Sequence, residues 1–274
     1  MSRKIKLENK NVVLTGCNSG IGYETLQVLL AKGNKVLGVD RETYNLDKID
    51  NENLTVMEMD VATKEGVDAI FAKAEEMFDF IDVFYANAGF PQYERVNYVD
   101  WDRPLYMFDT NVFSQMYTYE KYVEYLDGRE GNLAMTISCI GSLAIPGFTM
   151  YSASKFAMHG FQQGIRAGEL PKNVTFTTLN PIATATNFFW TGNPVKYQRP
   201  IPIQSPKHVA KFMVKSIEKG KGDVCPSKLF GIFGWLFNVI PPMRWIYWTL
   251  NNIALASLDK EQAKKKPRQT KKPY

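Results

Sequence analysis

Two side chains that could exchange protons, Tyr151 and Lys155, lie four residues apart in the segment YSASK. On a helix this spacing places both side chains on one face. An ammonium group beside a phenol stabilises the phenolate and lowers a tyrosine pKa that is about 10 in water. A tyrosine tuned in this way can trade a proton with an alcohol or a carbonyl near neutral pH. The pair therefore predicts general acid/base chemistry at an oxygen atom.

The spacing is not specific by itself, because Tyr44 and Tyr117 are also followed by a lysine four residues later. A serine distinguishes the YSASK pair. Ser138 ends an apolar run thirteen residues before Tyr151, and neither of the other two tyrosines has a serine at that distance. We expect Ser138 to lie where the strands of a parallel sheet end, which is the edge where such sheets bind ligands.

A glycine-rich stretch, TGCNSGIG, places Gly16, Gly20 and Gly22 between the first predicted strand and a helical segment. The first glycine permits a tight turn, and the later ones let the backbone approach a pyrophosphate and let the helix pack on the sheet. The start of the helix then offers amide donors and a partial positive charge to the phosphates. Three glycines alone are a weak signal, but this context is the one that a dinucleotide site requires.

The second predicted strand ends in Asp40, whose carboxylate can accept hydrogen bonds from the ribose hydroxyls of adenosine and repel a 2′-phosphate. This favours NAD as the cofactor. Arg41 follows directly, and its guanidinium suits a 2′-phosphate, so NADP stays open as the alternative.

Short apolar runs, each ending in glycine or small polar residues, alternate with helix-length segments through most of the chain. Such runs are typical of buried parallel strands. The alternation predicts an α/β fold with a doubly wound parallel sheet of the Rossmann type in a single domain over residues 1–226. The six predicted strands span residues 11–16, 35–40, 54–60, 81–89, 131–138 and 174–181.

These motifs, in this order, resemble the short-chain dehydrogenase/reductase family in its form with a TGxxxGxG loop and a YxxxK pair. The resemblance covers about residues 10–186 and includes DV at Asp60, NAG at Asn87 and Asn111 in DTNVF. It implies an NAD(P)-dependent oxidoreductase acting on CH–OH groups. Tyr151 would be the general acid/base, and Lys155 would bind the nicotinamide ribose and lower the tyrosine pKa.

The resemblance also implies roles for the remaining motif residues. Ser138 would bind the substrate oxygen, and Asn111 would hold a water that links Lys155 to solvent. The predicted catalytic set is Asn111, Ser138, Tyr151 and Lys155. The predicted cofactor contacts are Gly16, Asn18, Ser19, Gly20, Ile21, Gly22, Asp40, Arg41, Asp60, Val61, Asn87, Ala88, Gly89, Tyr151, Lys155, Pro181, Thr184 and Thr186.

Two positions depart from the family pattern. Ala86 stands where the family usually has the first asparagine of Asn-Asn-Ala-Gly, which is a mild change. Ile182 follows Pro181 where the family has glycine, so the backbone there is expected to keep a negative φ. Thr184 and Thr186 are still expected to reach the nicotinamide carboxamide.

The segment after the sixth predicted strand would form the substrate loop, and its aromatic side chains favour a bulky apolar substrate. We expect a hydroxysteroid or bile-acid-like alcohol, a long-chain keto-lipid or a 3-oxoacyl thioester. The predicted substrate contacts are Phe148, Phe188, Phe189 and Trp190. A non-enzymatic NAD(P)-binding sensor or scaffold is the alternative function.

Residues 227–258 form an unusual apolar extension, with Arg244 as the one charge after residue 228. Pro241 and Pro242 interrupt it after twelve residues, whereas a membrane-spanning helix needs about 20. We therefore expect two short helices that act as a lid over the substrate or as an interface in a homodimer or homotetramer. Peripheral membrane contact is the alternative, since tryptophan and tyrosine favour the headgroup level.

The charge of the chain is concentrated in the tail, residues 259–274, which carries seven basic and two acidic residues and is expected to be disordered. The remaining residues are balanced, which argues against nucleic-acid binding. The three cysteines are widely spaced and predict no disulfide framework, and His159 and His208 are isolated, so no metal site is expected. With no signal-like segment before the first strand, the cytoplasm is the expected location.

Overall fold

The computed structural model describes residues 4–264 except 95, 97–100, 187 and 189–201. Seven strands form one parallel sheet in the order β3-β2-β1-β4-β5-β6-β7. The order reverses direction between β1 and β4, as in doubly wound sheets. This confirms the predicted fold class, and each of the six predicted strands is present. The strands are β1 (Asn11–Thr15), β2 (Lys35–Asp40), β3 (Leu54–Glu58), β4 (Val83–Ala86), β5 (Gly131–Thr136), β6 (Val174–Leu179) and β7 (Asp223–Val224).

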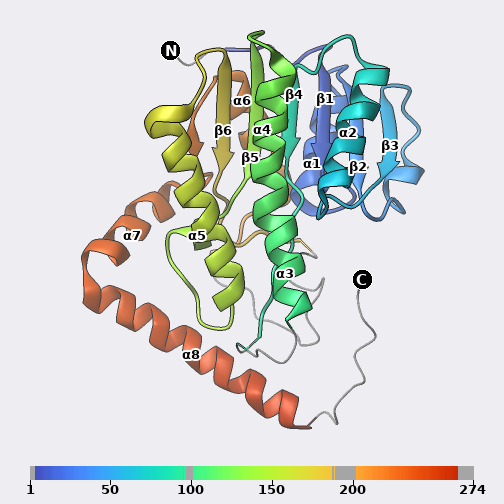
Figure 1. The fold of residues 1–274 in the computed structure, drawn as a ribbon. Coiled ribbons are helices and arrows are strands. Elements are labelled where there is room, and N and C mark those ends of the chain that lie inside the picture. Colours follow the sequence, from blue (N-terminus) through green and yellow to red (C-terminus); the bar gives the residue numbers. More distant parts are fainter. Residues whose placement is uncertain (1–3, 95, 97–100, 187, 189–201, 265–274) are drawn as a thin grey trace.

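Helices cover both faces of the sheet (Figure 1). One face packs against α1 (Gly20–Leu30) and α6 (Pro206–Glu218), which supply leucine, valine and methionine to the same core. The other face packs against α2 (Lys64–Met77), α4 (Ser114–Leu126) and α5 (Thr149–Gly164). A short helix α3 (Asp102–Phe108) runs into α4 through a π-helical turn, η2 (Asp109–Phe113).

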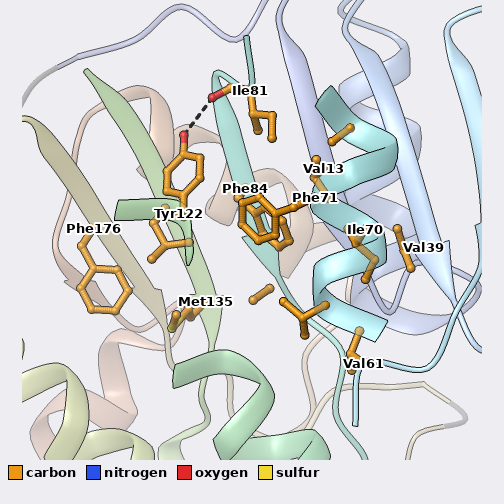
Figure 2. Packing of buried hydrophobic residues seen from close by; sticks show 14 of the residues in the cluster. Val13, Val39, Val61, Ile70, Phe71, Ile81, Phe84, Tyr122, Met135 and Phe176 are labelled. Carbon is orange, nitrogen blue, oxygen red and sulfur yellow. Dashed lines mark hydrogen bonds between the residues drawn. The ribbon is translucent and has the colours of Figure 1, made fainter. Parts of the chain in front are cut away.

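The core beneath α2 and α4 is rich in aromatic side chains (Figure 2). The rings of Phe71 and Phe84 stack with centroids 4.9 Å apart. Tyr122 is buried beside them, and its hydroxyl donates to the carbonyl oxygen of Ile81 at 3.0 Å. Because a buried hydroxyl is costly without a partner, this bond allows a tyrosine to fill the core.

The apolar extension forms two helices, α7 (Lys228–Val239) and α8 (Pro241–Lys264), which meet at the proline pair as predicted. α8 has 24 residues and continues to Lys264, so the expectation of a short second helix, and of disorder over residues 259–264, is wrong. Figure 1 shows α8 crossing the end of the molecule near α5 and α3. Trp248 donates to the carbonyl oxygen of Ala144 at 2.9 Å, and Leu255 is buried in a cluster with Tyr151. Within the part of the chain that is described, no helix has the length and hydropathy to cross a membrane.

Candidate active site

A cavity of about 530 Å³ lies at the carboxyl ends of the strands, where the glycine loop, the YSASK helix and the C-terminal extension meet. Nearly all predicted site residues line it. They are Gly16, Asn18, Ser19, Gly20, Ile21, Gly22, Asp40, Arg41, Asp60, Val61, Asn87, Ala88, Gly89, Ser138, Phe148, Tyr151, Lys155, Pro181, Thr184, Thr186 and Phe188. Asn111 lies behind the wall, and Phe189 and Trp190 fall outside the described residues.

Two glycines of the loop are required by backbone packing. A Cβ atom on Gly22 would lie 2.0 Å from the carbonyl oxygen of Gly16. Gly16 itself has φ +67°, and a Cβ there would lie 2.6 Å from the Cα of Ala88. Gly16 thus packs against the backbone that follows β4, and Gly22, in α1, packs against Gly16. A larger residue at either position would push these backbone segments apart.

The start of α1 presents unpaired amide donors to the cavity. Ser19 is the N-cap residue, and its side chain makes no capping hydrogen bond. The first N–H groups of a helix have no acceptor within the helix, so those of Gly20, Ile21 and Gly22 are available to an anion. With the helix dipole, these donors suit the pyrophosphate of a dinucleotide cofactor.

Asp40 and Arg41 both line the cavity at the end of β2. One carboxylate oxygen of Asp40 accepts from the backbone N–H of Asn18 at 2.9 Å, which links the strand end to the glycine loop. Burial raises the pKa of Asp40, and backbone donors to the carboxylate oppose that rise. Arg41 donates to the hydroxyl of Tyr106 at 3.2 Å, and that hydroxyl donates to Asp60 at 2.6 Å.

Two asparagines in the cavity wall use their side chains to hold loops in place. The side-chain oxygen of Asn18 accepts from the backbone N–H of Asn45 at 2.8 Å. Asn87 donates to the carbonyl oxygen of Gly16 at 2.9 Å and accepts from the hydroxyl of Thr136 at 2.9 Å. Asn87 thus joins the end of β4 to the strands on either side of it.

Tyr151 is buried and lies among aromatic side chains. Its ring makes edge contacts with Phe148 and Phe188 at centroid distances of 6.1 Å and 6.0 Å. Burial raises the pKa of Tyr151, and a hydrogen bond with Ser138 lowers it in part. Ser138 also donates to the carbonyl oxygen of Pro181 at 3.4 Å. The serine and the tyrosine therefore meet at one point of the cavity.

Lys155 is buried on the same helix, with its ammonium nitrogen 5.8 Å from the centroid of the Tyr151 ring. Burial lowers the pKa of Lys155 from 10.5 to about 7. Its nitrogen donates to the carbonyl oxygen of Thr136 at 3.4 Å. The sequence predicts a net fall in the Tyr151 pKa, and this is wrong for the structure, because burial penalises the charged form of both groups.

Asn111 lies in the π-helical turn η2 and is fully buried. Its amide accepts from the N–H of Phe90 and donates to the carbonyl oxygen of Phe90, both at 3.0 Å. A Cβ on Gly89 would lie 2.9 Å from the Asn111 oxygen and 3.6 Å from the Lys155 nitrogen. The position that a side chain at residue 89 would occupy therefore lies next to both the Asn111 oxygen and the Lys155 nitrogen. A water that links Asn111 to Lys155 stays a prediction.

The loop after β6 keeps the geometry expected for its unusual isoleucine. Among the described residues, non-glycine positions with positive φ are Asn9, Asp127 and Ser138, so Ile182 keeps a negative φ as predicted. Thr184 donates to the carbonyl oxygen of Ile182 at 2.9 Å. The hydroxyl of Thr186 accepts from the N–H of Phe188 at 3.2 Å. Both threonines line the cavity.

Part of the cavity wall is apolar and comes from three separate segments. The residues are Ile140, Leu143, Ile145, Phe148, Phe188, Leu229, Phe230, Phe237 and Tyr247. The last four belong to α7 and α8, and none of them is among the substrate contacts predicted from the sequence. Their apolar character was visible in the sequence, but only the fold shows which of them face the cavity. Tyr106 was also missed, and nothing in its sequence context indicates a site.

The sheet, the glycine loop and the serine–tyrosine–lysine group define a nucleotide-dependent oxidoreductase. The model of the short chain dehydrogenase family matches residues 10–195. The chain belongs to this family and is an NAD(P)-dependent oxidoreductase, as the sequence motifs predict.

A curated relative agrees with this assignment, and solved structures agree with the fold. An uncharacterised oxidoreductase of Staphylococcus saprophyticus is 30% identical over 66% of this chain and 76% of its own length. A short chain dehydrogenase/reductase from Burkholderia phymatum, solved with NAD, has a TM-score of 0.75 at 17% identity and covers 85% of this chain and 94% of its own. A short chain dehydrogenase from Burkholderia cenocepacia, solved with NADP, has a TM-score of 0.72 at 20% identity over 87% and 96%.

Proposed function

We propose that the enzyme transfers a hydride between the nicotinamide and a secondary alcohol or ketone on a bulky hydrophobic substrate. The observation that carries this proposal is the apolar wall of the cavity that Tyr151 lines, to which α7 and α8 contribute four side chains. Removing apolar surface from water stabilises binding by about 25 cal/mol for each Å². A wall of this kind therefore favours a steroid-like or lipid-like substrate over a sugar.

Each member of the polar group has a role in this proposal. Tyr151 donates the proton to the substrate oxygen during reduction, because burial keeps its phenol protonated at neutral pH. Ser138 orients the same oxygen by a hydrogen bond. The bound nicotinamide supplies or accepts the hydride. Lys155, whose pKa is about 7, can return a proton toward Tyr151, with Asn111 holding the path to solvent.

We propose NAD as the preferred cofactor. Asp40 stands in the cavity wall at the end of β2, where a carboxylate favours a free ribose hydroxyl over a 2′-phosphate. Arg41 is engaged with Tyr106, and Tyr106 is in turn bonded to Asp60. These contacts direct the guanidinium toward the Asp60 side, which supports NAD over NADP.

The substrate class is tested by turnover on a panel of ketones and alcohols that includes hydroxysteroids, bile-acid-like alcohols, keto-lipids, 3-oxoacyl thioesters and sugars. Tyr247→Ala removes a half-buried ring from the wall and is expected to raise KM for the bulky apolar substrates while leaving kcat for small alcohols close to that of the wild type. Thr249→Ala, at an exposed position of α8, is the matched control. A preference for sugars, or equal effects of both variants, would contradict the proposal.

The alternative function, a cofactor-binding sensor or scaffold, predicts binding of NAD(P) with no turnover on the whole panel. The family assignment argues against this alternative, as does the meeting of Ser138, Tyr151 and Lys155 in the cavity, because a sensor has no need of a proton donor there. Cofactor titration and turnover measured on one preparation distinguish the two functions.

The outer face of α8 supports a further proposal, that this helix contacts an anionic membrane surface. Trp245, Ile246, Leu250 and Ile253 are each more than 60% exposed on it. Basic residues dominate the sequence after residue 259, which would add attraction to anionic lipid. Leu229, at the start of α7, lines the cavity and is also 62% exposed.

This contact is measured by pelleting with vesicles of anionic or zwitterionic lipid. Wild type is expected to pellet with anionic vesicles, and Trp245→Ser with Ile253→Ser to stay in solution. If both proteins stay in solution, the membrane proposal is refuted. Light scattering gives the mass of both proteins in solution. A wild type of dimer or tetramer mass and a double variant of monomer mass would assign this face of α8 to the predicted homo-oligomer instead.

A further inference from the structure

Two cysteines that are 86 residues apart in sequence lie in contact beside the candidate active site. The sulfur atoms of Cys139 and Cys225 are 3.5 Å apart. Cys139 follows β5 and Cys225 follows β7, and the end of β6 lies between those strands. The thiol of Cys139 also donates to the carbonyl oxygen of Asn180, directly after β6, at 3.0 Å. The sheet order therefore creates a pair that the sequence spacing does not indicate.

The two thiols differ in exposure, which gives them different chemical roles. Cys139 is buried, whereas Cys225 is partly exposed. The contact with Cys139 lowers the pKa of Cys225 to about 7, and the same contact raises the pKa of Cys139. Thiolates are the reactive form of cysteine, so Cys225 is the group that meets an oxidant first. Cys17, the remaining cysteine, is buried elsewhere, and its thiol donates to the carbonyl oxygen of Val39.

We propose that Cys139 and Cys225 are a redox-sensitive pair that a small peroxide converts to a disulfide. In the first step the Cys225 sulfur attacks one oxygen of hydrogen peroxide, the O–O bond breaks, and a sulfenic acid and water result. The Cys139 sulfur then attacks the Cys225 sulfur, the S–O bond breaks, and the leaving hydroxide takes the Cys139 proton. Overall, two thiols are oxidised, one peroxide is reduced, and two molecules of water leave.

The contact is close enough for this step without unfolding. A disulfide has an S–S length of about 2.05 Å, so the sulfur atoms need to approach by about 1.5 Å. Cys225 lies in the short connection between β7 and α7, whose first turn is capped by Ser227 through Phe230 N–H. A small shift of this connection can supply the approach.

The disulfide would join the segment after β5 to the segment before α7, and both segments lie next to the candidate active site. Cys139 directly follows Ser138, and Cys225 precedes α7, which contributes Leu229 and Phe230 to the cavity wall. Oxidation would therefore clamp the start of α7 to the end of β5. This consequence rests on the proposed function, and it predicts a reversible fall in turnover on bulky substrates.

The chemical step is tested on the full chain with hydrogen peroxide, followed by thiol titration in denaturant and mass spectrometry of a non-reducing digest. We expect two of the three thiols to disappear, a Cys139–Cys225 linked peptide to form, and dithiothreitol to restore all three. Cys17→Ala should still lose both of its thiols, and Cys225→Ser should give no linked peptide. Three titratable thiols after treatment, or oxidation of Cys225 with no link, would overturn the proposal.

Two further readouts separate the clamp from the proposed enzyme activity. A cross-link between distant segments restricts the unfolded chain, so peroxide should raise the Tm of the wild type but not that of Cys225→Ser. Turnover of the wild type should fall with peroxide and return with dithiothreitol, while Cys225→Ser keeps its turnover. A linked peptide with unchanged turnover would refute the clamp and leave the enzyme intact. A protein with no turnover before oxidation would refute the proposed function and leave the Tm readout valid.

Discussion

Replacing Lys155 with methionine tests the electrostatics of the site through stability. The Lys155 side chain is 2% exposed, and burial lowers its pKa from 10.5 to about 7. At 1.36 kcal/mol for each pKa unit, this difference corresponds to a cost of about 5 kcal/mol for the charged amine in the folded state. Methionine has a similar length and no charge, so Lys155→Met removes that cost.

The sign of the pH dependence follows from proton binding. Below about pH 7 both the folded and the unfolded states hold the proton, and the wild type carries the full cost. Between about pH 7 and pH 10.5 the unfolded state binds more protons than the folded state, so the wild type becomes more stable as pH rises. Lys155→Met should thus exceed the wild type in free energy of unfolding at low pH, with the difference shrinking toward high pH.

Urea unfolding of both proteins from about pH 6 to about pH 10 measures this difference directly. Lys207→Met, at an exposed position, is the control and should show no change in its difference from the wild type across that range. If the Lys155→Met difference is the same at every pH, desolvation does not lower the pKa of the Lys155 amine in the folded state.

Two further substitutions test the cofactor site. Gly22→Ala places a Cβ atom 2.0 Å from the carbonyl oxygen of Gly16 and should lower the free energy of unfolding by at least about 1–3 kcal/mol. Gly160→Ala, where a Cβ meets nothing within 4 Å, should be neutral or stabilising by up to about 1 kcal/mol, and similar melting curves for the two variants would contradict the packing argument. Asp40→Ala should lower the ratio of kcat/KM with NAD to that with NADP by about tenfold or more, since a hydrogen bond to a charged group contributes about 1.5–3 kcal/mol. An unchanged ratio would show that Asp40 does not select the cofactor.

Local patterns made much of the fold predictable. The alternation of apolar runs and helical segments indicates the parallel sheet. Gly16 and Gly22 mark the turn after the first strand, because neighbouring backbone packs too closely there for a larger residue. The sequence distances between Ser138, Tyr151 and Lys155 indicated that these residues belong together. Such distances are informative here because only a short segment connects the end of β5 to the helix α5.

Contacts between distant segments could not be predicted in the same way. The hydrogen bonds from Arg41 to Tyr106 and from Tyr106 to Asp60 join three segments of the chain. No repeating pattern in the sequence indicates them. The contact of Cys139 with Cys225 depends on the order of the strands. The sequence predicts two helices for the apolar extension, but the place of Tyr247 in the cavity wall depends on the passage of α8 near α5. A fall in the Tyr151 pKa was expected from Lys155, whereas burial raises the pKa of Tyr151 in the structure.

The most direct test of the proposed function is turnover by Tyr151→Phe. This variant removes one hydroxyl from a buried ring and leaves the ring contacts with Phe148 and Phe188 in place. The measurement is the change in nicotinamide absorbance with the best substrate of the panel, next to a fluorescence titration of the cofactor on the same preparation. We expect turnover to be lost while cofactor affinity stays at the wild-type value. Turnover retained by Tyr151→Phe would contradict the assignment of Tyr151 as the proton donor.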